Sequence, residues 1–230
     1  QCQGLRVCSF RYLPSRGEVV ARARVGTCQR YEYTNHATME LPDFSAQPTL
    51  RVPSEAHPTL GSALAAVAAS SASATTIRLA AGVYREGTLH LCRGVSLVGA
   101  GSDTVLESEG TVLVCDGAAL VSDLSVRQVG GDASGAAYGI EVRSGSLLLE
   151  RCDVAASCGA KLAAAVLARG AAVALRLREC KLHDCGGAGL LLASKASADV
   201  QQTVSHTGLE PRTSRQGPRQ ACYSHDWASP

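Results

Sequence analysis

Short apolar segments alternate with polar residues from residue 76 to about residue 204, and Gly, Ser and Asp separate them. A two-residue alternation predicts half-buried strands, because successive side chains of a strand point to opposite faces. The predicted strands are Ile77 to Leu79, Thr88 to Leu91, Val95 to Val98, Val105 to Glu107, Val112 to Val114, Ala119 to Val121, Leu124 to Val126, Ile140 to Val142, Leu147 to Leu149, Cys152 to Val154, Ala165 to Leu167, Val173 to Leu177, Cys180 to Leu182 and Leu190 to Leu192. Too little sequence lies between them for crossover helices, which excludes a doubly wound sheet and leaves a sandwich or a solenoid.

Three of these segments repeat with a constant 28-residue period: AALVSDLSV (118–126), SLLLERCDV (146–154) and ALRLRECKL (174–182). Apolar or thiol side chains occupy the same repeat positions, namely Ala119, Leu147 and Leu175; Val121, Leu149 and Leu177; Leu124, Cys152 and Cys180; Val126, Val154 and Leu182. Between the two alternating halves, Asp123, Arg151 and Glu179 break the alternation and predict a bend. A fixed period is typical of stacked repeats and favours the solenoid.

A second set of segments recurs with a shorter, 25-residue period: GIEV (139–142), AAVL (164–167) and GLLL (189–192). This alignment places Ile140, Ala165 and Leu190 at one repeat position. Two different periods indicate strands of fixed length joined by turns of variable length. We therefore predict an all-β fold, a right-handed single-stranded parallel β-helix with about three short strands per coil and about 4.8 Å between coils.

The chain divides into three parts. Residues 1–56 are irregular in composition; a strand from Val19 to Val25 is expected to pair with Arg30 to Thr34, and Leu41 to Pro58 is expected to form a linker or an extended strap. Residues 57–204 form the β-helix repeat domain, and residues 205–230 a disordered or atypical tail. Because the tail contains no evident capping helix, we expect a shortened chain.

A capping helix is predicted at the start of the repeat domain, from Thr59 to Ser70. Leu60, Leu64 and Val67 fall on one stripe of a helix, and Thr59 is suited to the N-cap. A helix of about three turns depends on packing, so this one is expected to cover the first coil.

The composition of the chain argues against several classes of binding partner. Lys and Arg number 22 against 20 Asp and Glu, so no overall field attracts a phosphate backbone or an anionic membrane surface. Aromatic residues make up only 4%, which leaves little surface for stacking bases, and no apolar run approaches the length of a membrane span. Ten cysteines are scattered without a CxxC pair, and no secretory signal is visible. These features predict reduced thiols, a cytoplasmic location, and neither nucleic acid nor membrane as a partner.

The opening coil carries a recognisable phrase, TTIRLAAGVYREGTLHLCRGVSLVGAG (75–101), preceded by the predicted helix. It resembles the opening coil of right-handed parallel β-helix proteins. The later segments LERCDV and LRECKLHDCGGAGLLL resemble the repeats of the β-helix family that includes the Shc SH2-domain-binding protein, its testis spindle-associated relative and certain F-box proteins, over about residues 60–204; no F-box is visible upstream. The phrase from Ala81 to Glu86 is also similar to the first coil of pectin methylesterases.

The resemblance implies a non-enzymatic protein-interaction scaffold or adaptor in signalling, or in spindle, cytokinesis or meiotic assemblies, with a cytoplasmic or cytoskeletal location. The expected partner is a protein, and the expected contact elements are two long loops, Gln128 to Tyr138 and Ala155 to Lys161. The alternative is a carbohydrate-active esterase or lyase of the same fold.

Glycan chemistry on this fold needs two carboxylates together on one outer face. In the repeat alignment, however, the residues in register with Asp153, Glu150 and Glu179 in the adjacent repeats are neutral or of opposite charge. One further acidic residue, Asp123, shares the repeat position of Glu179, but it lies two coils away. We therefore expect no catalytic residue, no cofactor and no glycan ligand.

A zinc site can be imagined from the thiols and imidazole at Cys152, Cys158, Cys180, His183 and Cys185. Cys152 and Cys180 fall in the inward register, however, where a thiol packs as a small apolar group. No conventional spacing of four ligands appears, so no metal is expected.

Overall fold

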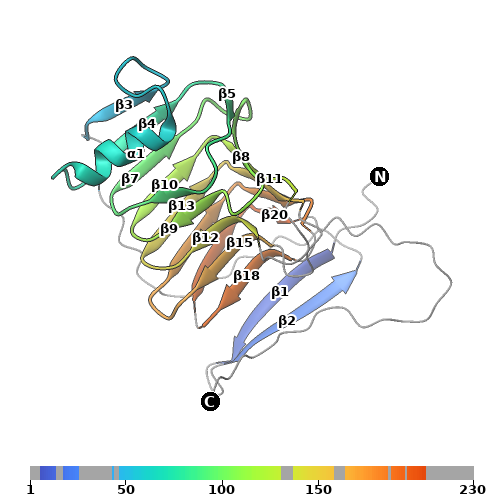
Figure 1. Ribbon diagram of the computed structural model, residues 1–230. Coiled ribbons are helices and arrows are strands. Elements are labelled where there is room, and N and C mark those ends of the chain that lie inside the picture. The colour runs from blue at the N-terminus through green and yellow to red at the C-terminus, as the bar shows by residue number, and fades with distance from the viewer. Residues whose placement is uncertain are drawn as a thin grey trace.

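The computed structural model describes the strand backbones at 6–13 and 18–25, residue 43, and residues 47–130, 137–157, 164–185, 188–194 and 196–205. Within this part of the chain, three parallel sheets stack coil upon coil along one axis (Figure 1). The chain passes through the three sheets in turn, and each strand pairs with its counterpart in the next coil. This is a parallel β-helix with one short helix, so the predicted fold class is confirmed.

The three sheets contain 7, 6 and 5 strands. The first sheet consists of β3 (Thr49–Val52), β4 (Thr75–Leu79), β7 (Val95–Val98), β10 (Ala119–Ser122), β13 (Ser146–Glu150), β16 (Ala174–Arg178) and β19 (Ser197–Gln201). The second consists of β5 (Gly82–Tyr84), β8 (Thr104–Ser108), β11 (Ser125–Gln128), β14 (Asp153–Ala156), β17 (Lys181–His183) and β20 (Val204–Ser205). The third consists of β6 (Leu89–Leu91), β9 (Leu113–Cys115), β12 (Tyr138–Val142), β15 (Ala164–Arg169) and β18 (Ala188–Ala193).

The 28-residue register is confirmed in the first and second sheets. Leu147 pairs with Ala119 on one side and with Leu175 on the other, and Val154 pairs in the same way with Val126 and Leu182. All of these side chains are at most 1% exposed. The core is therefore a column of aliphatic ladders inside the coils.

The predicted register of the third sheet is wrong by one position at β15. Ile140 pairs with Val166 rather than with Ala165, and Val166 in turn pairs with Leu190. The step from β12 to β15 is therefore one residue longer than expected, and the step from β15 to β18 is one residue shorter. A slip of one position turns every side chain of a strand to the opposite face, and only the observed pairing keeps Val166 inside with Ile140.

A corner joins the first sheet to the second, and the bend predicted there is confirmed. The corner residues adopt left-handed backbone conformations, with φ of 56° at Asp123, 50° at Arg151, 53° at Glu179 and 49° at Gln202. Their amides bond across the coils, for example Asp123 N–H to the Glu150 carbonyl at 3.1 Å. The left-handed conformation costs an L-residue about 1–2 kcal/mol, which the stacked corner bonds offset in part.

The helix α1 (Leu60–Ala69) covers the first coil, as predicted (Figure 1). Thr59 is its N-cap, and the Thr59 hydroxyl accepts a hydrogen bond from the Ser62 amide at 3.1 Å. Its buried side chains are Leu60, Ala63, Leu64 and Val67. Among the described residues, no helix has the length and hydrophobicity needed to cross a bilayer.

One prediction upstream of the helix needs correction, and a second is tested only in part. Residues 49–52 are not linker: β3 pairs in parallel with β4 and adds a strand to the first sheet, with Val52 buried and Pro53 following directly. Farther upstream, β2 (Glu18–Val25) pairs antiparallel with β1 (Arg6–Leu13). The partner expected for this strand, residues 30–34, lies outside the described residues.

Candidate functional site

The phrase shared with pectin methylesterases has a structural role in this chain. The Tyr84 hydroxyl donates to the Val52 carbonyl at 3.1 Å or to the Ala80 carbonyl at 3.0 Å. The next residue, Arg85, pairs with Glu107 of the following coil at 2.6 Å. Because these contacts join the first coils to one another, the phrase helps to hold the start of the β-helix together.

Glu86, which ends this phrase, caps the helix α1. Its carboxylate oxygens accept hydrogen bonds from the amides of Leu60 and Gly61, both at 2.7 Å. The first amides of a helix have no partner within it, and the helix dipole favours a negative charge there. A carboxylate some 25 residues downstream in the chain therefore fixes the start of the helix.

We expect Glu86→Ala to lower the free energy of unfolding by about 1–2 kcal/mol, because the amides of Leu60 and Gly61 lose their charged acceptor. Chemical denaturation of the purified chain measures this loss. Glu55→Ala is the matched control, since Glu55 is exposed and its side chain makes no hydrogen bond or ion pair with the described residues. An equal effect of both changes would show that the carboxylate does not hold the helix.

Carboxylates on the outer face of the third sheet are engaged by arginines. Glu141 has a side chain only 6% exposed, and its two oxygens bind Arg143 and Arg169, each at 2.8 Å. Asp116, in the preceding coil, also acts on Arg143 and lies 3.6 Å from His90. The hydrogen bond to Glu141 raises the pKa of the Arg143 guanidinium. Two acidic residues thus share one sheet face, but both oxygens of the buried one are occupied.

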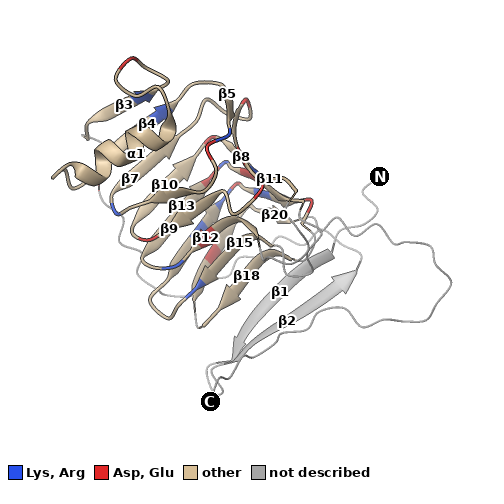
Figure 2. Ribbon diagram, viewed as in Figure 1, with Lys and Arg blue, Asp and Glu red and all other residues tan. Residues whose placement is uncertain are grey.

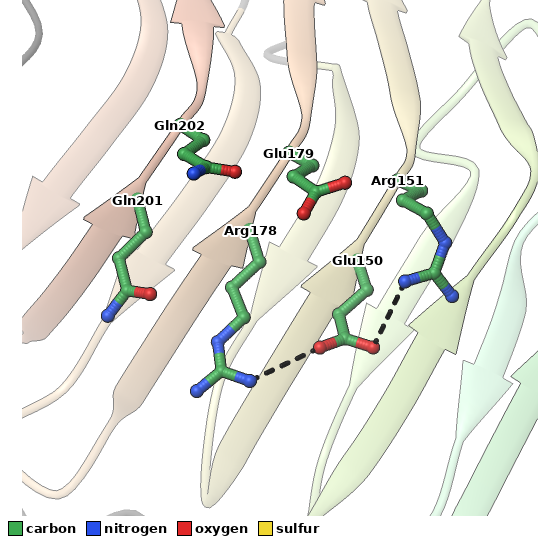
Figure 3. A pocket seen from close by; sticks show the side chains of 6 residues that line it. All are labelled: Glu150, Arg151, Arg178, Glu179, Gln201 and Gln202. Carbon is green, nitrogen blue, oxygen red and sulfur yellow. Dashed lines mark hydrogen bonds and ion pairs between the residues drawn. The ribbon is translucent and has the colours of Figure 1, made fainter.

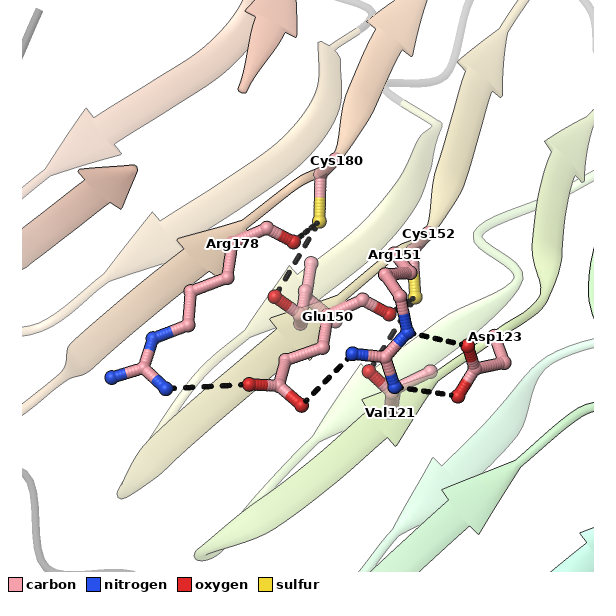
Figure 4. A network of polar contacts seen from close by, with 8 residues as sticks. Val121, Asp123, Glu150, Arg151, Cys152, Arg178 and Cys180 are labelled. Carbon is pink, nitrogen blue, oxygen red and sulfur yellow. Dashed lines mark hydrogen bonds and ion pairs between the residues drawn. The ribbon is translucent and has the colours of Figure 1, made fainter. Parts of the chain in front are cut away.

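Charged side chains at the corner between the first and second sheets form an ion-pair network (Figure 4). Arg151 binds Asp123 through two bonds of 2.6 and 2.8 Å and lies 3.6 Å from Glu150, which contacts Arg178 at 3.3 Å. The hydrogen bond from Arg151 lowers the pKa of Asp123 and raises that of the guanidinium itself. The alternation of charge expected from the repeats is therefore present, and the charges neutralise one another across coils.

A groove of about 300 Å³ opens at the same corner (Figure 3). Three consecutive pairs of residues line it, each pair consisting of the last residue of a first-sheet strand and the corner residue after it: Glu150 and Arg151, Arg178 and Glu179, Gln201 and Gln202. The repeat alignment placed the four charged residues of this groove in register, but it did not indicate the two glutamines or the groove itself.

The described thiols of the imagined zinc site lie against main-chain carbonyls. Cys180 Sγ lies 3.4 Å from the Leu149 carbonyl, and Cys185 Sγ lies 3.1 Å from the His183 carbonyl. Burial raises the pKa of Cys185 to about 11, which keeps its thiol protonated at neutral pH. Within the described ranges, no three His, Cys, Asp or Glu side chains are placed to hold a metal ion. Cys158 lies outside those ranges.

One cluster was not foreseen from the sequence: His183 lies between two carboxylates. Its Nε2 contacts Asp153 of the neighbouring coil, and its Nδ1 contacts Asp184 at 2.8 Å. Burial alone would lower the pKa of His183, but the hydrogen bonds to both carboxylates outweigh it and raise the pKa. Both nitrogens can donate only when the ring is protonated, so the cluster stabilises the imidazolium.

The raised pKa of His183 makes the stability of the folded chain depend on pH. Because the pKa of His183 is raised on folding, its contribution to stability is complete below the unfolded value of about 6.5 and is lost as the pH rises through the folded value. The difference in melting temperature between the wild type and His183→Asn should therefore become smaller as the pH rises from about 6.5 through the pKa of the folded state. Lys181 and Cys185, which also lie close by, remain unchanged in this comparison. A difference that does not vary with pH would contradict the cluster.

The two expected contact loops are only partly described, since residues 131–136 and 158–163 lie outside the described ranges. Gln128, at the start of the first loop, is fully buried rather than available for contact. Its amide nitrogen donates to the carbonyls of Glu109 and Gly130, at 2.9 and 2.7 Å. The residue anchors the loop, and the role of the loops in contact stays a prediction.

No family model matches the chain, and no curated protein matches it. Among solved structures, the chain is similar to a pectin methylesterase in complex with a hexasaccharide, at 10% identity and a TM-score of 0.41, covering 71% of this chain and 62% of that one. It is also similar to the Aspergillus niger pectin methylesterase in deglycosylated form (16% identity, TM-score 0.34, 70% and 62% covered). The penultimately deglycosylated form of that enzyme gives 16% identity, a TM-score of 0.36, and coverage of 74% and 70%. The chain thus spans less than two thirds of the first two structures, and nothing about activity follows from the likeness.

Proposed function

We propose that the chain is a non-enzymatic protein-interaction scaffold built on β-helix repeats. The observation that supports this is the mutual pairing of the outward charges: Glu141 with two arginines, Arg151 with Asp123, and Arg176 with Asp199 at 3.1 Å. A positive charge beside a carboxylate favours its ionised form, which suits it poorly to act as a general acid. Figure 2 shows acidic and basic positions interspersed along the sheets rather than gathered in one field. Such a surface suits a protein partner better than a polyanion.

The finer part of the proposal follows from the sequence resemblance. The repeats from residue 60 to 204 are similar to those of the Shc SH2-domain-binding and spindle-associated β-helix proteins. A signalling adaptor, or a component of spindle, cytokinesis or meiotic assemblies, located in the cytoplasm or on the cytoskeleton, is the role we infer. The proposal requires no cofactor, metal, nucleic acid or membrane.

The test is reconstitution of a complex. A partner protein is first identified by affinity purification with the whole chain, and the purified components are then mixed and analysed by size-exclusion chromatography with light scattering. We expect a complex of fixed stoichiometry that survives at about 0.15 M salt, where the Debye length is about 8 Å. If none of the purified partner proteins binds the purified chain, the proposed scaffold function is contradicted.

A second candidate, a carbohydrate-active esterase or lyase, is favoured by one observation: Asp116 and Glu141 act on the same arginine from adjacent coils of one sheet. Methyl-esterified polygalacturonan is the substrate to try, with methanol and unsaturated uronides as the products to measure. We expect neither product. Turnover that disappears in Glu141→Gln would replace the scaffold with the enzyme.

A further inference from the structure

Two exposed arginines lie side by side at the start of the first sheet: Arg51 on β3 and Arg78 on β4 (Figure 2). They are register partners, so their strands lie about 4.8 Å apart. Like charges directly opposite each other on neighbouring strands repel. Neither guanidinium forms an ion pair or a hydrogen bond with another described residue, and this includes Glu55 in the turn after β3. Two positive charges therefore stand together here without a counter-charge.

The register row that begins with this pair has no acidic residue in the next two coils. Arg78 is followed by Val98 and then by Ser122, and the first carboxylate of the row belongs to Glu150 on β13. At the spacing between parallel strands, Glu150 stands about 14 Å from Arg78. The Debye length is about 8 Å at physiological salt, and Glu150 already contacts Arg178 at 3.3 Å. The row itself therefore does not neutralise the arginine pair.

On the third sheet, one carboxylate of this chain bridges a comparable pair of arginines. Glu141 binds Arg143 and Arg169 through its two oxygens, each at 2.8 Å, and these arginines follow equivalent positions of adjacent coils. A carboxylate suits this role because each of its oxygens accepts hydrogen bonds from a different guanidinium. Arg51 and Arg78 also come from adjacent strands in register, so the same bridge fits them.

We propose that Arg51 and Arg78 together bind the carboxylate of an aspartate or glutamate in an acidic segment of a partner protein. The partner supplies the bridging carboxylate that this chain supplies to its other arginine pair. Thr49 is exposed two residues before Arg51, on the same face of the strand, and its hydroxyl offers a further donor to the segment. The proposal rests on the scaffold function and gives it a docking point, near the end of the solenoid that α1 covers.

The test titrates the ¹⁵N-labelled whole chain with short peptides and follows the Nε–H resonances of Arg51 and Arg78 by NMR. N-acetyl-tetraglutamate amide is the acidic probe, and N-acetyl-tetraglutamine amide is its neutral counterpart. At low salt, where charges are screened least, we expect saturable shifts of both resonances with the acidic peptide and none with the neutral one. No shift with the acidic peptide, or equal shifts with both peptides, would overturn the proposal. Tighter binding of inorganic phosphate than of the acidic peptide would also overturn it, because the pair would then be a phosphate site.

Matched variants separate the arginine pair from a general effect of positive charge. Arg51→Gln and Arg78→Gln should each weaken binding of the acidic peptide about tenfold, the equivalent of about 1.4 kcal/mol, because one guanidinium alone cannot complete the bridge. Arg127→Gln is the control, since Arg127 is exposed on β11 with Glu107 and Ala155, rather than an arginine, as register partners. Each of the first two variants removes a repulsion, so neither should melt below the wild type. Equal weakening in Arg51→Gln and Arg127→Gln would overturn the proposal.

The reconstituted complex distinguishes this contact from the scaffold function itself. A complex that forms with the wild type and is weakened in the double variant, Arg51→Gln with Arg78→Gln, supports both. A complex that forms equally well with the double variant overturns the docking point and leaves the scaffold function standing. If the acidic peptide binds but no partner protein does, the scaffold function is contradicted while the carboxylate contact stands.

Discussion

Replacing Leu149 by aspartate is expected to unfold the β-helix. Leu149 is 0% exposed, between Val121 and Leu177 in a ladder that runs through the first sheet. The change removes a buried leucyl group, worth about 2–5 kcal/mol, and places an unpaired carboxylate in the core at further cost. The sum is comparable with the total stability of a domain, about 5–15 kcal/mol. Circular dichroism and thermal melting should show the loss of the cooperative transition, and Leu177→Asp should behave in the same way.

The control is an outward position of the same solenoid. Arg127→Asp alters an exposed strand residue, and we expect a change of less than about 1 kcal/mol. Glu150→Lys, an outward change that the repeat alignment alone would rate as nearly silent, is less suitable, because Glu150 contacts both Arg151 and Arg178. Comparable damage from Leu149→Asp and Arg127→Asp would refute the assigned faces of the strands.

The sequence predicted the parts of the fold in which the side chains distinguish one register from another. In the first sheet, large aliphatic residues such as Leu147 and Leu149 flank an outward position, and the bend at Arg151 follows at a constant distance. Only one alignment of neighbouring coils buries all of these aliphatic residues. The 28-residue spacing is therefore a physical constraint, and the structure reproduces it.

The third sheet lacks this contrast. Its strand β15 reads AAVLAR, in which several consecutive small apolar residues suit either face, so sliding Ala165 against Ile140 has no visible cost in the sequence. The strands β3, β19 and β20 were missed for a related reason. Each carries few large apolar residues, and its pairing with a neighbouring coil supplies the stability that its own pattern does not show.

The candidate site was only partly visible in the sequence. The register placed Glu150 beside Arg178, so their pairing could be foreseen. The contact of His183 with Asp153 could not, since Asp153 has Lys181 as its register partner and the imidazole reaches it diagonally. The buried Nε of Arg178, which has no hydrogen-bond partner among the described residues, is likewise a result of side-chain orientation, which no periodicity records.

Gly145→Ala is expected to destabilise the chain by about 2–4 kcal/mol, the second largest effect, through strain at one corner of the coil. Gly145 has φ +76°, and a Cβ added to it would lie 2.6 Å from the carbonyl carbon of Gly117 in the preceding coil. Backbone cannot move aside as a flexible side chain can, so the two coils would have to separate. Gly130→Ala measures the cost of the backbone dihedral alone, because Gly130 has φ +77° and nothing lies within 4 Å of a Cβ added to it.

We expect this control to cost only about 1 kcal/mol, the penalty of the left-handed conformation alone. Urea denaturation of the two variants, with equal m-values as a check that the same surface unfolds, measures the difference. A larger loss at Gly145 than at Gly130 means that close contact between neighbouring coils limits which residues fit this corner. Equal losses would mean that the coils can part locally, and that the backbone dihedral alone determines the requirement for glycine.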